Sequence, residues 1–518
     1  MNKAVTKFIS VFTTVFIIFF ALSFGEKVKA GAFFDIINGK PGVPGTVYSG
    51  ETPPNLDPEK PVLVFVQGLF NSSSIWWDDN DIYEKAYENG YQTAFVELYD
   101  SSGNPRSNWV NGELLARQLE QIYEHFGGKK LAVIGYSKGG IDTQTAVVHY
   151  GKNDIVSNIF TIGTPHYGSP LADLAFSDWT WWLSSLLGTR NEGVYSLQTG
   201  VMEHFRQITD QSKDVVKTPY YMIAGNDWGS VGTPTWFGGL YLSLWGENDG
   251  LVPLSSAFLP YGDKLATLNV DHLHIQKGEN IFPFIHQQLN EKNIQENKHL
   301  SNTYSMNTAF SPQMTQGNML LRGGKQEGKA TESFLVEDQV DKVTIDWIGA
   351  HPIDEIELID PDHQTVDFTV QTWQDDNIFK GAYHHTIEIE RPKQGTWEVK
   401  TVAKQSTAYA LTVLFKSQQL DSLKVKTNQE NGLAKIKAKK EFAQKIKMDY
   451  NITFIPADKV KNKGKIIRSI KQSTLKEINI PFQKKGVYQM TMDITGTTPN
   501  GAPYQRTIVQ SFYHDPEK

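Results

Sequence analysis

Ser137 lies in a sequence pattern that could perform nucleophilic chemistry. The segment Gly135-Tyr136-Ser137-Lys138-Gly139 follows an apolar run over residues 131–134 and precedes a helical pattern over residues 141–150. A serine on a sharp strand-to-helix turn has its hydroxyl lifted clear of the sheet, and the positive end of the helix faces a developing oxyanion. The pattern therefore predicts that Ser137 attacks a carbonyl carbon; an ordinary glycine-rich turn is the alternative.

A serine hydroxyl is a weak nucleophile at neutral pH, so Ser137 needs a base within hydrogen-bond reach and an acid that orients the base. Where a serine nucleophile sits on such a turn, the chain order is serine, acid, histidine. Asp227 and Asp249 are candidate acids, and His272 and His274 are candidate bases. Chain order alone does not choose among them. Three other histidines are expected to be structural: His149, His166 and His286.

The elements that must position these residues alternate between strand and helix from about residue 60 to residue 290. Apolar runs over residues 61–66, 131–134 and 159–162 are typical of strands buried on both faces of a parallel sheet. Residues 113–126 carry apolar side chains along one helical face. This alternation predicts a doubly wound, mostly parallel α/β domain over residues 31–290.

Four separated segments of this region resemble the α/β-hydrolase family, and within it the bacterial extracellular lipases and esterases. The segments are Val66-Gln67-Gly68-Leu69-Phe70, the turn around Ser137, residues 163–169, and residues 247–253 together with Asp271-His272-Leu273. The resemblance implies hydrolysis of a carboxylic ester through an acyl-enzyme. Gln67 departs from the pattern, since most relatives have histidine there, and the departure concerns the support of its loop.

The resemblance also distinguishes the candidates. It favours Asp249 as the acid, and His272 as the base because the lipase pattern places the base directly before a leucine. It implies an oxyanion hole formed by the backbone N–H groups of Lys138 and Leu69, with Phe70 as a rival for the second position. The side chain of Lys138 is expected to face solvent and to take no chemical part.

Tryptophan and leucine side chains gather between residues 170 and 200, where this fold places lids. Phe70, Trp181 and Trp182 are the candidates to line an acyl groove under such a lid. The alternative is a small helical cap that packs for stability. Either arrangement predicts apolar walls, which favour an acyl ester or lipid over a peptide or sugar. No cofactor or metal is expected, because His274 stands where calcium-binding relatives have aspartate.

The first thirty residues have the pattern of a signal peptide, with Lys3 and Lys7 before an apolar run over residues 8–24. We therefore expect export and a mature start at Gly31; a retained membrane anchor is the alternative. The chain has no cysteine, which excludes thiolate metal sites and cysteine nucleophiles. Loss of four lysines and one glutamate with the leader changes the formal charge from −7 to −10. This acidic balance does not indicate nucleic-acid binding.

Beyond residue 290 the sequence changes character. Residues 291–330 are polar and are expected to form a linker. Alternating apolar and polar residues then predict a β-sandwich over residues 331–418 and a second sandwich-like domain over residues 419–518. The second domain is rich in lysine, which indicates either exposed strand faces or contact with an anionic cell-wall polymer or lipid surface.

Taken together, these patterns predict a secreted serine hydrolase of acyl or lipid esters. A polyester depolymerase or another acyl hydrolase is the alternative within the same chemistry. A catalytically disabled hydrolase that serves in adhesion or binding is the alternative outside it, and the complete set of Ser137, Asp249 and His272 argues against that hypothesis.

Overall fold

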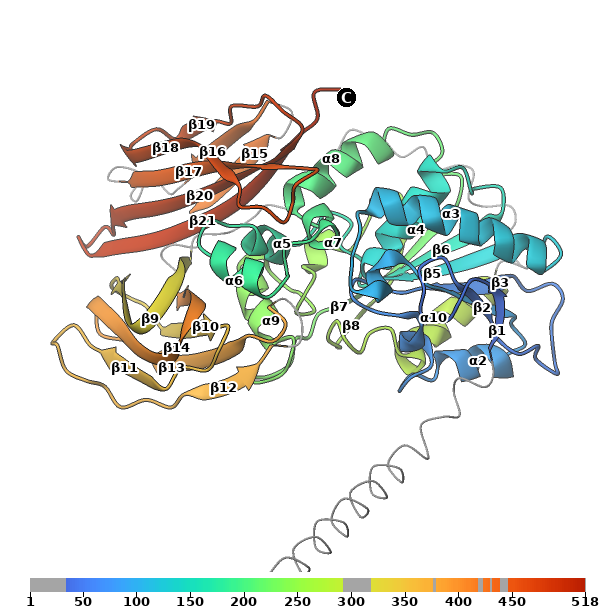
Figure 1. Cartoon of the computed structure of the whole chain (residues 1–518), viewed down its shortest axis with the longest axis horizontal. Helices are drawn as coiled ribbons and strands as arrows, with labels where there is room; N and C mark the ends of the chain where they lie inside the picture. Colours follow the sequence, from blue (N-terminus) through green and yellow to red (C-terminus); the bar gives the residue numbers. More distant parts are fainter. Residues whose placement is uncertain are drawn as a thin grey trace, which may run out of the picture.

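The structure is a computed structural model that describes residues 34–291, 318–375, 379–417, 423–428, 431–437 and 446–517. The expected signal peptide and residues 292–317 of the expected linker lie outside these ranges. Within them, no helix combines the length and the hydropathy needed to cross a bilayer. Figure 1 shows an α/β domain on one side, two groups of antiparallel strands on the other, and short helices between them.

An eight-stranded sheet forms the centre of the α/β domain, in the order β1-β2-β4-β3-β5-β6-β7-β8. The strands from β4 to β8 in this order are parallel, and β1 and β2 pair antiparallel at one edge. This confirms the expected fold class. The strands are β1 Asp35–Asn38, β2 Val47–Ser49, β3 Val62–Val66, β4 Thr93–Val96, β5 Leu131–Tyr136, β6 Val156–Ile162, β7 Tyr220–Gly225 and β8 Asp263–Leu268.

Helices cover both faces of this sheet, because alternate residues of its central strands point to opposite sides. In β3, Val62 and Val64 pack in one hydrophobic core, whereas Leu63 and Phe65 pack in the other. Helices α3 and α4 close the first core, and α2 and α10 close the second. These helices are α2 Ile82–Glu88, α3 Asn108–His125, α4 Lys138–His149 and α10 Gly278–Glu291. Helix α3 begins at Asn108, earlier than the expected residue 113, because the side chain of Ser107 caps its N-terminus.

Short helices lie between the α/β sheet and the C-terminal strands (Figure 1). They are α5 Pro170–Ala175, α6 Trp181–Leu186, α7 Glu192–Ser196, α8 Thr199–Thr209 and α9 Trp236–Leu242. Their apolar side chains share hydrophobic cores with the strands beyond them: Leu183 packs with Ala410, and Val194 with Val487. The C-terminal half therefore packs against the α/β domain through hydrophobic cores that it shares with these short helices.

Residues 318–417 form one antiparallel sheet of six strands. Its core includes Trp347 and Tyr409, whose rings stack with their centroids 4.4 Å apart. Strand β9 begins at Met319, so the expectation of a linker up to residue 330 is wrong over this stretch: the polar residues there pair with β14. The strands are β9 Met319–Val336, β10 Lys342–Gly349, β11 Glu355–Ile359, β12 Gln371–Gln374, β13 Tyr383–Glu390 and β14 Gly395–Lys416.

The final β unit contains a three-stranded sheet in the order β15-β16-β19 and a four-stranded sheet in the order β18-β17-β20-β21. Apolar side chains of both sheets meet in one core, among them Ile436, Ile452 and Met490. The strands are β15 Lys424–Asn428, β16 Leu433–Lys437, β17 Lys447–Pro456, β18 Lys465–Ser473, β19 Glu477–Asn479, β20 Gly486–Thr497 and β21 Pro503–His514.

A buried histidine joins the six-stranded sheet to helix α9. Nδ1 of His384 lies 2.7 Å from a carboxylate oxygen of Asp346, and its Nε2 lies 3.2 Å from Asp375. The ring of Phe237, from α9, lies 5.0 Å from the imidazole. Burial alone would lower the pKa of His384, but the two carboxylates raise it to about 9. We therefore expect a buried imidazolium between two aspartates at neutral pH.

This imidazolium makes the stability of the sheet depend on pH. The folded-state pKa of His384 exceeds the usual value of 6.5, so the stabilisation is complete below pH 6.5 and is lost as pH rises through about 9. We expect the melting temperature to fall between pH 7.5 and 10, by roughly 4–8 °C for each kcal/mol lost in a domain of about 100 residues. Calorimetry of His384→Gln should show no such fall in melting temperature over this pH range. An equal fall in wild type and variant would contradict the assignment.

Candidate active site

Ser137 occupies a strained turn between β5 and α4. Its backbone angles are φ 53° and ψ −127°, in a region that residues with a side chain rarely adopt. The two flanking glycines permit this turn: a Cβ at Gly135 would lie 2.7 Å from the Cα of Gly140, and one at Gly139 would lie 2.4 Å from the carbonyl oxygen of Gln67. The local packing therefore requires the glycine–X–serine–X–glycine pattern.

The structure brings together Ser137, His272 and Asp249. Oγ of Ser137 lies 3.0 Å from Nε2 of His272, and Nδ1 of His272 lies 2.7 Å from Oδ2 of Asp249. The other oxygen of Asp249 accepts the backbone N–H groups of Leu251 at 3.1 Å and Val252 at 2.8 Å. With Nδ1–H directed to a carboxylate, Nε2 is left as the acceptor that faces the serine hydroxyl.

Two further interactions orient the imidazole. The backbone N–H of His272 donates to the carbonyl oxygen of Asp249 at 2.8 Å, so the two loops are joined through both backbone and side chain. The hydroxyl of Tyr136 donates to the carbonyl oxygen of His272 at 2.8 Å, and the two rings lie 5.2 Å apart. Tyr136 immediately precedes the nucleophile, and nothing in the sequence pattern indicates this contact with the base loop.

The rival acid and base lie in other environments. Asp227 accepts the backbone N–H groups of Trp228 and Gly229 in its own turn. His274 is exposed and pairs with Asp271, with Nδ1 2.7 Å from Oδ1. The three histidines that were expected to be structural form hydrogen bonds elsewhere: His149 with Thr209, His166 with Thr161, and His286 with Tyr91. Burial lowers the pKa of His166 well below its usual value, which keeps its imidazole neutral.

The loop after β3 passes directly beside the nucleophile. A Cβ built on Gly68 would lie 2.9 Å from the Cβ of Ser137, so the backbone from Gly68 to Phe70 borders the position where a substrate carbonyl would sit. Gln67, at its start, is fully buried, and Phe70 adopts φ 61° with 45% of its side chain exposed. On the other side, Lys138 begins α4 and directs its N–H from the first turn of the helix. These are the elements that an oxyanion hole requires.

Comparison with known proteins extends this picture over most of the chain. Residues 61–194 match the model of the alpha/beta hydrolase fold, and residues 318–418 match the model of the Hemicentin galactose-binding domain-like family. The crystal structure of Bacillus licheniformis lipase BlEst2 in propeptide form is 34% identical, covers 92% of this chain and 98% of that chain, and superposes with a TM-score of 0.77.

The chain belongs to the α/β-hydrolase family of lipases and esterases. It is thereby assigned to a family of carboxylic ester hydrolases. A triacylglycerol lipase of Vibrio cholerae is 30% identical over 114 residues, which cover 22% of this chain and 35% of that protein. Triacylglycerol lipase 2 of Saccharomyces cerevisiae is 28% identical over 171 residues, which cover 32% of this chain and 52% of that protein. The matches thus span about a third to half of these two lipases.

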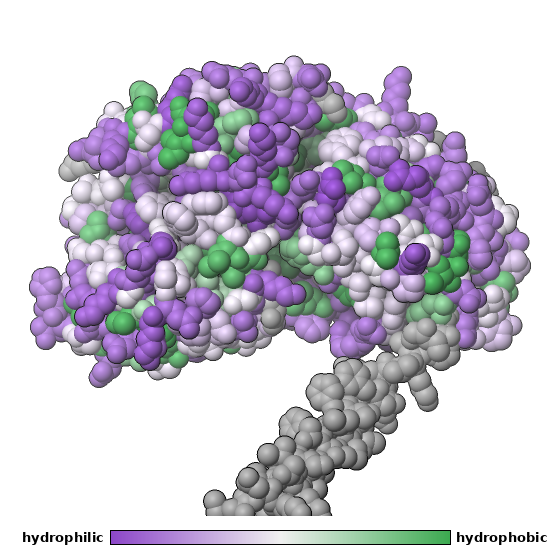
Figure 2. All heavy atoms as spheres, viewed as in Figure 1, coloured by the Kyte–Doolittle hydropathy of each residue, from purple (hydrophilic) through white to green (hydrophobic). Residues whose placement is uncertain are grey.

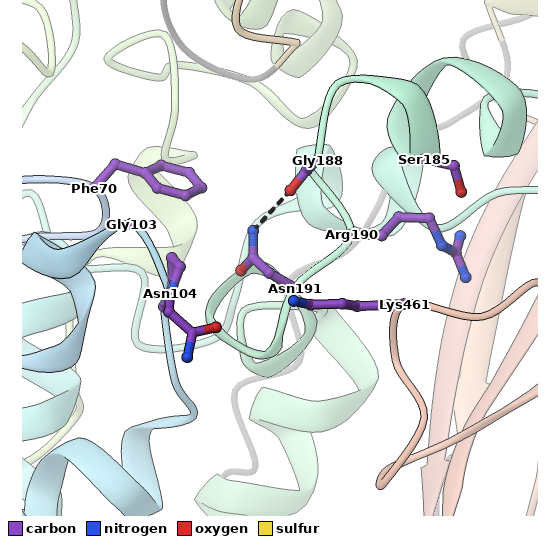
Figure 3. Close-up of a pocket in the computed structure, with 9 residues that line it drawn as sticks. Phe70, Gly103, Asn104, Ser185, Gly188, Arg190, Asn191 and Lys461 are labelled. Atoms are coloured by element: carbon purple, nitrogen blue, oxygen red, sulfur yellow. Dashed lines mark hydrogen bonds between the residues drawn. The ribbon is translucent and has the colours of Figure 1, made fainter.

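Beside the loop after β3, which passes next to the nucleophile, lies a cavity of about 270 Å³. Phe70 and Asn104 border it on the α/β side, and Lys461 extends into it from the final β unit toward Asn191 (Figure 3). The guanidinium of Arg190 points away from Phe70 in this view and donates to the carbonyl oxygen of Asn462 at 3.2 Å. The cavity is therefore closed on one side by residues of the C-terminal half.

The tryptophans expected to line an acyl groove lie on helix α6. Trp182 has 45% of its side chain exposed, and Leu186 has 60%. The ammonium group of Lys463, from the final β unit, lies 5.6 Å from the ring of Trp181 and 5.7 Å from that of Trp182. Figure 2 shows apolar side chains over α6 near the centre of this face. The helix thus presents an apolar surface next to the final β unit.

The expected solvent exposure of the Lys138 side chain is wrong. The side chain is fully buried, and its ammonium group lies 3.0 Å from carboxylate oxygens of Asp100 and Asp142. Asp100 is supplied by the turn after β4, and Asp142 by the next turn of α4. One signal for the pair was present in the sequence, since Lys138 and Asp142 are four residues apart and share a helical face.

Proposed function

We propose that this protein hydrolyses carboxylic esters of acyl or lipid substrates through Ser137, His272 and Asp249. Oγ of Ser137 attacks the ester carbonyl carbon while Nε2 of His272 accepts the hydroxyl proton. The tetrahedral intermediate collapses to an acyl-enzyme, and the departing alcohol takes the proton from His272. Water then attacks the acyl group, again with His272 as base, and frees the acid. The observation that carries the proposal is the hydrogen-bonded order Ser137–His272–Asp249.

The relatives and the surroundings of the site support lipid or acyl esters as substrates. The curated relatives are named triacylglycerol lipases, and α6, whose Ser185 lines the same cavity as Phe70, presents exposed tryptophan and leucine side chains. A series of p-nitrophenyl esters from acetyl to palmitoyl tests the proposal with the wild-type protein. Turnover that rises with chain length supports a lipase, and turnover restricted to short chains supports an esterase. Release of hydroxy acids from a polyester film would support the depolymerase alternative.

We further propose that the protein is exported and that its mature chain begins at Gly31. Basic residues followed by an uncharged apolar run support this proposal. Mass spectrometry of protein recovered from the culture medium of an expressing bacterium tests it, with an N-terminal peptide that starts at Gly31 as the expected result.

The likeness to a lipase in propeptide form leads us to propose that residues 318–517 act as a propeptide. Their contacts with the helices beside the site support this proposal. The hydroxyl of Tyr195 accepts the N–H of Val487 at 2.9 Å, and Lys463 lies over the rings of α6. A final β unit held in this way would restrain α6 and hinder access of long acyl chains.

Cleavage between the two halves is therefore expected to raise activity. A protease recognition sequence is introduced within residues 292–317, and the α/β domain is separated from the C-terminal half after cleavage. The value of kcat/KM for a long-chain ester should then rise by about tenfold or more, because a conformation with α6 free no longer competes with one in which the final β unit restrains α6. The same protease treatment of the chain without the inserted sequence is the control. Unchanged kcat/KM after complete separation would contradict the propeptide proposal.

Contact of the final β unit with an anionic cell wall or lipid surface also stays a proposal. Strand β18 is an edge strand whose Ile466 is 49% exposed, and the following turn leaves Leu475 64% exposed. Exposed lysines, including Lys465 and Lys471, accompany them, and Figure 2 shows apolar side chains among hydrophilic ones over this part of the molecule. Salt-sensitive sedimentation with isolated cell walls or anionic vesicles supports the contact; no sedimentation at low salt contradicts it.

A further inference from the structure

The ammonium group of Lys138 is the centre of a buried ionic cluster directly behind the nucleophile. It donates hydrogen bonds of 3.0 Å to Oδ2 of Asp100 and to both carboxylate oxygens of Asp142. The side-chain amide of Asn111 donates to both aspartates, with 3.1 Å to Asp142. All four side chains are essentially inaccessible to solvent. Three of them carry charge, and a buried charge is costly unless it is paired with good geometry.

The members of the cluster come from three different elements. Asp100 lies in the 3-10 turn Tyr99–Ser102, Asn111 lies in the first turns of α3, and Lys138 and Asp142 lie in α4. The cluster therefore joins the start of α4 to two neighbouring elements. Because Lys138 is the first residue of α4, the residue whose ammonium is held by the cluster is also the residue whose backbone N–H begins the helix.

We propose that Lys138 is a positioning residue, whose buried ammonium fixes the first turn of α4 and so directs the Lys138 N–H at the oxyanion. This inference deepens the proposed function and rests on it. Ser137 has a strained backbone, and strain of this kind persists only where the surroundings hold it. The hydrogen bond from the N–H of Gly140 to the carbonyl oxygen of Ser137, at 3.1 Å, restrains the turn from within. The ionic cluster restrains it from the other side.

The charges of the cluster fit this role. Two carboxylates surround one ammonium, and burial raises the pKa of Asp142 to about 7 although Lys138 opposes the rise. The pKa of Asp100 is also raised by burial, and that of Lys138 is raised by the two aspartates despite its own burial. The two aspartates therefore favour the charged form of Lys138, which keeps the ammonium in its place between them.

Lys138→Met tests the inference, because methionine fills similar space without the tether. Rates are normalised to active sites titrated with a p-nitrophenyl alkylphosphonate, so that misfolded protein is not counted. We expect kcat for a short-chain ester to fall at least tenfold per titrated site with KM within about twofold, since loss of one oxyanion donor costs about 10²–10³ in kcat. A trifluoromethyl ketone, which forms a tetrahedral adduct, should lose affinity in parallel.

A matched variant at the other end of the same helix completes the experiment. Lys152→Met removes the ion pair with Glu120 beyond the other end of α4 and should retain kcat within about twofold. If Lys138→Met does not fold, Lys138→Gln takes its place with the same expected direction.

A per-site kcat of the Lys138 variant within twofold of wild type would overturn the inference, even with a lower melting temperature. A rise in KM with unchanged kcat would also overturn it. Absence of ester hydrolysis by the wild-type protein would instead contradict the proposed function, so the two failures are distinguishable.

Discussion

Replacing Ser137 with alanine is expected to lower kcat for a p-nitrophenyl ester by about a millionfold, close to the limit set by hydrolysis elsewhere on the protein surface. The hydroxyl oxygen of Ser137 is the atom that forms the acyl bond, and it is the hydroxyl that lies 3.0 Å from Nε2 of His272. Alanine also removes little volume, so the fold should be retained. Initial rates and the pre-steady-state burst of p-nitrophenol measure the effect, and both should disappear in the variant.

Ser102→Ala is the matched control for this change. Ser102 is exposed and its hydroxyl bonds only the carbonyl oxygen of Tyr99, at 2.8 Å, among the interactions described. Its loss should leave kcat within about twofold of wild type. A Ser137→Ala variant that turns over esters at the wild-type rate would end the enzyme assignment and favour a binding role for the fold.

Replacing Asp249 with asparagine is expected to lower kcat by about ten-thousandfold while the fold is retained. The amide is similar in shape to the carboxylate, but it cannot stabilise the imidazolium that forms when His272 accepts the proton. An NH₂ group facing Nδ1 would also favour the tautomer with the proton on Nε2, which cannot act as a base toward Ser137. Steady-state kinetics at pH 8, with circular dichroism to verify folding, measure the effect.

The rival pair provides the control for this prediction. Asp271→Asn changes the carboxylate that pairs with the exposed His274, and Asp227→Asn changes the turn after β7. Both variants should keep kcat within about threefold. A large loss in Asp271→Asn together with normal activity in Asp249→Asn would transfer the base to His274 and contradict the assignment of His272.

The architecture of the α/β domain could be predicted because its buried strands consist of uninterrupted apolar residues. Residues 62–66 are apolar without interruption, as a strand covered on both faces must be, and the structure buries all five. The glycines around Ser137 could be interpreted because only a close approach of backbone requires them at both positions. The proximity of Ser137, Asp249 and His272 could be expected only through chain order and family resemblance, since they are far apart in sequence.

Two features escaped prediction for the same physical reason. A lysine at the first position of a helix is normally solvated, and nothing local to Lys138 shows that Asp100 lies against it after folding. The polar stretch from residue 322 to residue 330 has the composition of a linker, yet its backbone pairs with β14 as a strand. In both cases the partner lies far away in the chain, and a pattern read along one segment does not contain it.

The packing of the C-terminal half adds a constraint on how the site operates. Asp173 of α5 accepts a hydrogen bond of 2.6 Å from Ser511 of β21, and Ser511 in turn accepts the N–H of Gly200 at 2.8 Å. These buried bonds tie the helices around the site to the last strand of the chain. Any movement of α5 or α8 must therefore be compatible with these contacts or must follow their release.

Trapping of the acyl-enzyme tests whether Ser137 is the nucleophile. The mature protein is mixed with excess p-nitrophenyl butyrate, quenched in acid during the burst, digested and mapped by mass spectrometry. We expect a butyryl group on Ser137 within its peptide, and no butyryl group on the corresponding peptide of the Ser137→Ala protein. Turnover with a butyryl group on a different residue, or an equal butyryl yield on the alanine variant, would contradict this assignment.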